Sequence, residues 1–82
     1  MSAAEEAALQ QLVDQRVALV AAHLIAQTAV NDGAPGAQEQ YEGAADAITK
    51  FDIENPAAKD AYLARIAKEP GPERERVAAA AK

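Results

Sequence analysis

The chain has 82 residues, a formal net charge of −5, a single histidine and no cysteine. The lack of cysteine excludes a disulfide framework, a thiolate zinc site and a thiol nucleophile. The acidic balance argues against a nucleic-acid partner, because a phosphate backbone favours clusters of Lys and Arg.

We expect a soluble, cytoplasmic protein with no membrane partner. Glu5 and Glu6 stand where a secretory signal peptide would carry basic residues. The longest apolar stretch, residues 17–26, is interrupted by His23 and is too short to cross a bilayer.

Alanine dominates the apolar composition. Half of the chain is hydrophobic, yet 23 residues are Ala and only 15 are Val, Ile, Leu or Phe. Because Ala is the strongest helix former, we predict an all-α protein, a single helical domain over residues 1–82. The expected compact bundle has one long helix, at about 2–31, and three shorter ones, at about 36–52, 56–68 and 72–81.

The long first helix has clear signals at both ends. Ser2 and Glu5 have the spacing of a capping box, which predicts the start. No Gly or Pro follows until the turn at residues 31–36, where Asn31 or Gly33 suits a left-handed C-terminal cap.

The second helix is predicted from a heptad-like stripe of apolar residues, with polar residues on its other side. The stripe consists of Ala37, Tyr41, Ala44, Ile48 and Phe51. For the third helix, Asn55 suits the N-cap and Pro56 the first helical position.

The third and fourth helices differ in how much apolar surface they can bury. The third has an apolar stripe of Ala58, Tyr62 and Ile66, whereas the fourth has one large apolar residue, Val77. Packing must hold the fourth helix in place, since short isolated helices are marginal in water.

The first helix carries the feature that most needs a functional explanation. Arg16, His23 and Gln27 project into the middle of its aliphatic face, while the opposite face is mainly Ala. Three interpretations remain open. In the first, this mixed aliphatic and polar face lies at the edge of the core. In the second, the Ala face packs inward and the mixed face points outward as a recognition surface. In the third, the helices close around the polar row, which consists of Arg16, His23 and Gln27, and form a pocket.

Helix starts and connections follow the rules used in protein design. Ser2 caps one helix, Asn55-Pro56 opens another, and Glu69-Pro70-Gly71-Pro72-Glu73-Arg74-Glu75-Arg76 joins two more. In these features the chain resembles de novo designed helical bundles. The resemblance implies a binder of the miniprotein type, with polar residues retained at positions 16, 23 and 27 for contact with a target.

We therefore predict a non-enzymatic helical binding module that presents one face of the first helix to a protein partner. The predicted contact residues are Leu12, Arg16, Val20, His23, Leu24 and Gln27. The alternatives are a scaffold without a partner and a bundle with a small-molecule pocket around His23 and Arg16. We expect no metal, no cofactor, and a monomer or weak self-association. A haem site with His23 as axial ligand is disfavoured, since few aromatic residues could enclose the ring.

Overall fold

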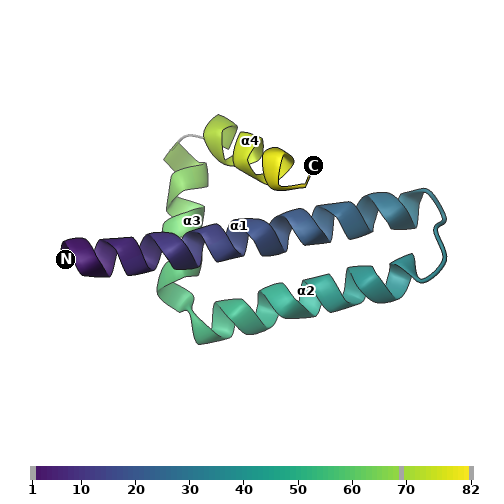
Figure 1. The fold of residues 1–82 in the computed structure, drawn as a ribbon, viewed down its shortest axis with the longest axis horizontal. Helices are drawn as coiled ribbons and strands as arrows, with labels where there is room; N and C mark the ends of the chain where they lie inside the picture. Colours follow the sequence, from purple (N-terminus) through teal and green to yellow (C-terminus); the bar gives the residue numbers. More distant parts are fainter. Residues whose placement is uncertain (1, 69, 82) are drawn as a thin grey trace.

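The computed structural model describes residues 2–68 and 70–81, and this part of the chain is all-α, as predicted. It contains α1 (Ala3–Asn31), α2 (Ala37–Glu54), α3 (Pro56–Lys68) and α4 (Pro70–Ala80). Helices α1 and α2 run antiparallel, α3 crosses α1 towards its N-terminal half, and α4 lies on the side of α1 away from α2 (Figure 1). The bundle measures 46 × 26 × 19 Å, because the 29-residue α1 sets its long dimension.

Both predicted ends of α1 are confirmed. The Ser2 hydroxyl accepts a hydrogen bond from the Glu5 backbone N–H at 3.2 Å. At the other end Gly33 has φ 74°, and the N–H groups of Gly33 and Ala34 donate to the carbonyls of Val30 and Ala29 at 3.0 Å. This is the Schellman pattern, in which a residue without a Cβ takes the left-handed position. Of the two candidates, Gly33 is therefore the left-handed residue.

At the junction of α2 and α3, the prediction for Pro56 is confirmed and the prediction for Asn55 is not. Helix α2 continues to Glu54, and α3 begins at Pro56 as predicted. Asn55 leaves the helical region, with φ −133° and ψ 62°, as expected for a residue that precedes proline. Its side-chain amide donates to the Phe51 carbonyl at 3.2 Å. Asn55 thus closes α2 with its side chain, and the predicted side-chain cap on α3 is wrong.

Helix α4 begins at Pro70, two residues before the predicted start. The Pro-Gly-Pro segment was expected to join the third and fourth helices, yet its residues occupy the first turn of α4. The first N–H groups of a helix have no partner within the helix, so prolines there remove no helical hydrogen bond.

The core lies where α3 crosses α1. Its buried residues are Val13, Val17, Ala58 and Tyr62. The partly buried residues packed around them come from all four helices and are Leu9, Leu12, Val20, Phe51, Ala61, Ile66 and Val77. The apolar stripes predicted for α2 and α3 face inward, with Ala37, Ala58 and Tyr62 buried. Helix α4 contributes Val77, as expected, and makes no contact with α2 within the described residues.

The aliphatic face of α1 points mainly into the bundle. Val13 is 0% exposed and Val17 is also buried. On the opposite face Ala18 and Ala22 are exposed, and only towards the C-terminal end are alanines covered, with Ala26 buried and Ala29 half-buried. The hypothesis that this aliphatic face points outward is therefore wrong for its central part. The physical reason is that α3 and α4 need large side chains from α1, because Ala alone buries too little apolar surface.

Candidate functional site

The polar row of α1 begins with Arg16, which is only 8% exposed. Its Nε donates to Asp52 Oδ1 at 2.8 Å and its Nη2 donates to Asp52 Oδ2 at 2.9 Å. The two residues thus form a bidentate ion pair between α1 and α2, the geometry that suits a planar guanidinium.

The same guanidinium also lies over the Tyr62 ring, 4.6 Å from its centroid, as in a cation–π contact. Arg16 therefore ties α1 to both α2 and α3. Its hydrogen bonds hold the pKa of Asp52 below the usual value, and burial only partly opposes this effect. The Asp52 carboxylate in turn raises the pKa of Arg16, so both groups are charged at neutral pH.

Arg16 is consequently not presented to a partner, and the prediction that it lies on a contact surface is wrong. A buried guanidinium needs a carboxylate and hydrogen-bond acceptors, and Asp52 supplies both. The sequence contained a signal for this pair that we did not use. Asp52 is four residues after Ile48 on the inward stripe of α2, where a charge needs a partner from another helix.

His23, the second member of the polar row, lies between α1 and α2. Its half-buried ring packs on Tyr41, with 4.6 Å between the ring centroids and a tilt of 34°. This arrangement matches the preferred geometry of aromatic pairs. His23 therefore has a packing role in the helix hairpin. Neither His23 nor Arg16 is among the described lining residues of the cleft that is described below.

The other predicted contact residues do not form one surface. Leu12 is half-buried and packs on the core, and Gln27 is exposed. Val20 is half-buried and Leu24 is 42% exposed. Of the six, the structure brings Val20 and Leu24 together in one cleft.

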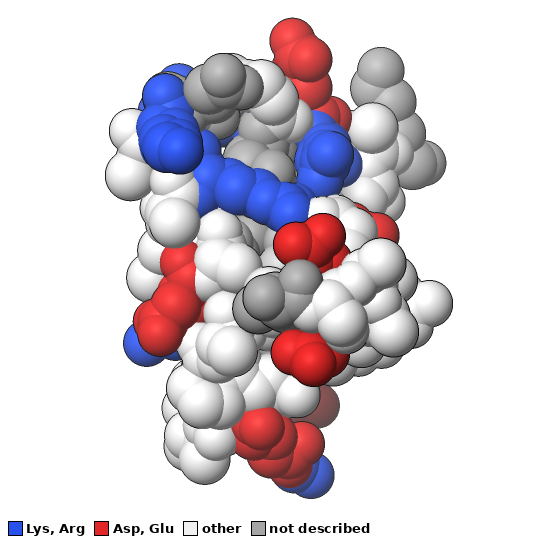
Figure 2. All heavy atoms as spheres, turned by 90° about the vertical axis from the view of Figure 1, so that its left-hand side faces the viewer, with Lys and Arg blue, Asp and Glu red and all other residues white. Residues whose placement is uncertain are grey.

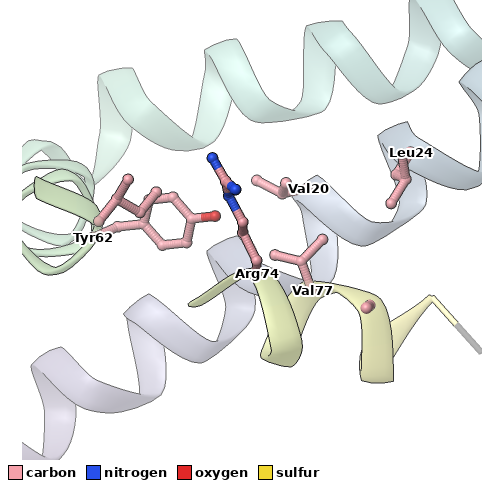
Figure 3. Close-up of a pocket in the computed structure, with 7 residues that line it drawn as sticks. Val20, Leu24, Tyr62, Arg74 and Val77 are labelled. Atoms are coloured by element: carbon pink, nitrogen blue, oxygen red, sulfur yellow. The ribbon is translucent and has the colours of Figure 1, made fainter. Parts of the chain in front are cut away.

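This cleft lies between α1, α3 and α4 and has a volume of about 330 Å³. Its lining residues are Val20, Leu24, Tyr62, Ile66, Arg74, Val77 and Ala78. In Figure 3, Val77 and Leu24 face the open space from α4 and α1, and the Tyr62 ring forms one end. The walls are apolar or aromatic except at Arg74, the composition typical of a small-molecule site.

The part of the cleft that comes from α3 and α4 was not predicted. The spacing of Tyr62 and Ile66 predicted an inward apolar stripe, and packing was expected to hold the helix of Val77 in place. Tyr62 is buried, at 5% exposed, whereas Ile66 and Val77 are only partly buried. The open space arises because α4 is short and brings one large aliphatic residue to α1, and no local sequence signal reports how such a helix docks.

Comparisons of the chain with protein-family models, curated proteins and solved structures find no significant match. The resemblance to designed helical bundles therefore stays a prediction. Within residues 2–68 and 70–81, no three His, Cys, Asp or Glu side chains come together in a way that could hold a metal ion. No helix in the described part of the chain is both long and apolar enough to span a membrane.

Proposed function

We propose that the protein is a non-enzymatic binding module and that the cleft between α1, α3 and α4 takes up a small apolar molecule. The observation that supports this proposal is the open volume of about 330 Å³, walled almost entirely by apolar side chains. Small-molecule sites have volumes from about 300 Å³ upward and are mostly apolar, with few polar groups. The lining residues that the structure describes include no Ser, Cys, His, Asp or Glu to act as nucleophile or general base.

The polar row of α1 gives a second reason to prefer the cleft. Arg16 and His23 were the strongest candidates for contacting a partner, and each already has a neighbour within the bundle. Using either one for binding would require breaking an interaction that holds two helices together. Val20 and Leu24, in contrast, line the cleft, so a ligand could contact them without breaking an interaction between helices.

A protein partner is the second candidate, and one observation favours it. Leu24 and Ile25 are 42% and 52% exposed on successive positions of α1. Leu24 also lines the cleft, so a partner could place an apolar side chain in the cleft and cover Ile25 beside it. In this case the partner would bind the side of α1 that is next to α4, where Leu24 and Ile25 lie, and not the predicted polar row.

Titration of the uniformly ¹⁵N-labelled chain with 1-octanol tests the proposal, with amide chemical shifts as the measurement. We expect saturable shifts concentrated at the cleft residues of α1, α3 and α4. Shifts that are absent, or that spread evenly over the helices without saturation, would rule out the cleft as a site for small apolar molecules. Binding of a partner protein without binding of octanol would support the second candidate.

A matched pair of α4 variants sharpens this test. Ala78 lines the cleft, whereas Ala79 is exposed and does not line it. We expect Ala78→Phe to fill the cleft and abolish octanol binding, and Ala79→Phe to bind octanol like the parent chain. Equal loss in both variants would show that a bulky residue on α4 disturbs binding regardless of the cleft.

A further inference from the structure

Among the described residues that line the cleft, Arg74 is the one with a charged side chain, and its setting differs from that of Arg16 and Arg65. Arg16 is paired with Asp52, and Arg65 donates a hydrogen bond to Gln10. Arg74, in contrast, forms no hydrogen bond or ion pair with any residue that the structure describes. Within the described part of the chain, an unpaired guanidinium thus lies at an apolar cleft.

Figure 3 shows how this side chain is placed. Arg74 extends from α4 into the space between Tyr62 and Val20, and the Tyr62 hydroxyl points towards it. A ligand whose apolar part lies along Val20, Leu24 and Val77 would therefore have its other end within reach of a cation. A guanidinium forms bidentate hydrogen bonds with a carboxylate, and these are stronger than bonds between neutral groups.

We propose that the ligand of the cleft is an apolar monocarboxylate whose carboxylate pairs with Arg74. This inference rests on the proposed function, because it names the chemical class of the molecule that the cleft takes up. Arg74 is the charged group that a carboxylate would meet at the described walls of the cleft, and because it is exposed we expect a modest contribution to affinity. An amine is disfavoured in the same position, since a second cation would lie beside Arg74 with no anion among the described lining residues.

The volume sets the size class of the ligand. A volume of about 330 Å³ lies at the lower end of the range for small-molecule sites, so we expect a small ligand. Octanoate, with a seven-carbon alkyl chain and a carboxylate, is the probe that we choose.

The charge distribution of the surrounding surface is consistent with an anionic ligand. In Figure 2, Lys and Arg side chains gather in the upper part of the molecule, at the level of the end of α3 and of α4. Acidic side chains are more frequent below, towards α2. The chain is acidic as a whole, yet α3 and α4, which supply most of the cleft, carry five basic residues, Lys59, Arg65, Lys68, Arg74 and Arg76, against three acidic ones, Asp60, Glu73 and Glu75. These two helices are therefore the less acidic part of the chain, which favours an anionic ligand over a cationic one.

The experiment compares octanoate, 1-octanol and octylamine on the full chain, with amide shifts and calorimetry as measurements. We expect Arg74→Gln to weaken octanoate binding about threefold to tenfold and to change octanol binding by less than about twofold. Arg76→Gln is the matched control, because Arg76 is exposed on the same helix and does not line the cleft. It should leave octanoate binding unchanged.

Charge reversal provides the sharper variant. Arg74→Glu should bind octylamine more tightly than octanoate, the reverse of the parent chain. Arg74 is exposed, so helicity and thermal unfolding should stay close to those of the parent, which separates a binding effect from misfolding.

The possible outcomes separate the two proposals. If octanol binds in the cleft while Arg74→Gln leaves octanoate binding unchanged, the carboxylate inference is overturned and the proposed function stands. If none of the three probes binds, both fail.

Discussion

The two sides of α1 differ in how completely their polar groups are satisfied. Towards α2 and the crossing of α3, Arg16 has a bidentate partner in Asp52 and a ring beneath it in Tyr62, and His23 packs on Tyr41. Towards α4, contact is made through Val77 beside an open cleft, and Arg74 has no partner within the described residues. Arg16 and His23 are thus in contact with neighbours inside the bundle, whereas Arg74 lies at the cleft without a partner among the described residues.

This difference shows why residue type alone did not identify the functional surface. A polar side chain among aliphatic residues is either satisfied within the fold or available to a ligand, and only its neighbours distinguish the two cases. The side of α1 with the most complete contacts holds the helices together, and the incompletely covered side is the one that we propose for binding. Stability should therefore be lost most readily on the α2 side, and ligand affinity on the α4 side.

The largest expected effect comes from removing Asp52. Asp52→Ala leaves the Arg16 guanidinium buried without its carboxylate, and we expect a loss of about 3 kcal/mol in the free energy of unfolding. Chemical denaturation measures this loss. Asp46→Ala is the matched control, since Asp46 is exposed on the same helix, and it should change stability by less than about 0.5 kcal/mol. Similar losses in the two variants would contradict the role given to the pair.

Acid should produce the next largest effect, through the same carboxylate. The folded-state pKa of Asp52 is lowered, so its contribution to stability is complete above the ordinary value of 3.8 and is lost as pH falls through the lower folded value. The loss is smaller than for Asp52→Ala, because a protonated carboxyl still accepts a hydrogen bond. Unfolding measured from pH 6 to pH 2 should show this step, and Asp52→Asn should lack it. An equal step in Asp52→Asn would assign the acid sensitivity to other carboxylates.

A smaller effect is expected on the other side of α1. Val77→Ala removes two methyl groups at about 0.8 kcal/mol each when fully buried, so a partly buried Val77 gives about 1 kcal/mol. The loss should be confined largely to the 11-residue α4, which is too short to be stable alone. Hydrogen exchange should become faster in α4 and change little in α2. Equal acceleration in both helices would mean that α4 unfolds only together with the hairpin.

The smallest effect concerns the aromatic contact of the hairpin. A double-mutant cycle of His23→Leu and Tyr41→Leu should give a coupling energy of about 0.5–1 kcal/mol, the range for tilted ring pairs. Thermal unfolding of the four chains measures this energy. A coupling energy near zero would mean that the ring contact does not stabilise the hairpin. The role given to the Arg16–Asp52 pair does not depend on this result.

The sequence was sufficient for the helices because their signals are local. Ser2, Gly33 and Pro56 act on backbone groups within a few residues, so their effects could be predicted from type and spacing. The Arg16–Asp52 pair joins residues 36 positions apart, and it depends on the rotation of α2 against α1. The cleft depends further on where α4 docks, which one valine and several alanines specify only weakly. Prediction therefore succeeded for the elements and failed where several helices had to be placed together.

The position of a bound probe tests the central claim most directly, that the cleft between α1, α3 and α4 is the binding site. Isotope-filtered NOE spectra of the ¹³C-labelled chain with unlabelled octanoate would locate the alkyl chain. The account predicts NOEs from the alkyl protons to the methyl groups of Val20, Leu24, Ile66 and Val77. NOEs confined to the exposed Ile53 and Leu63, with none at these four residues, would contradict it.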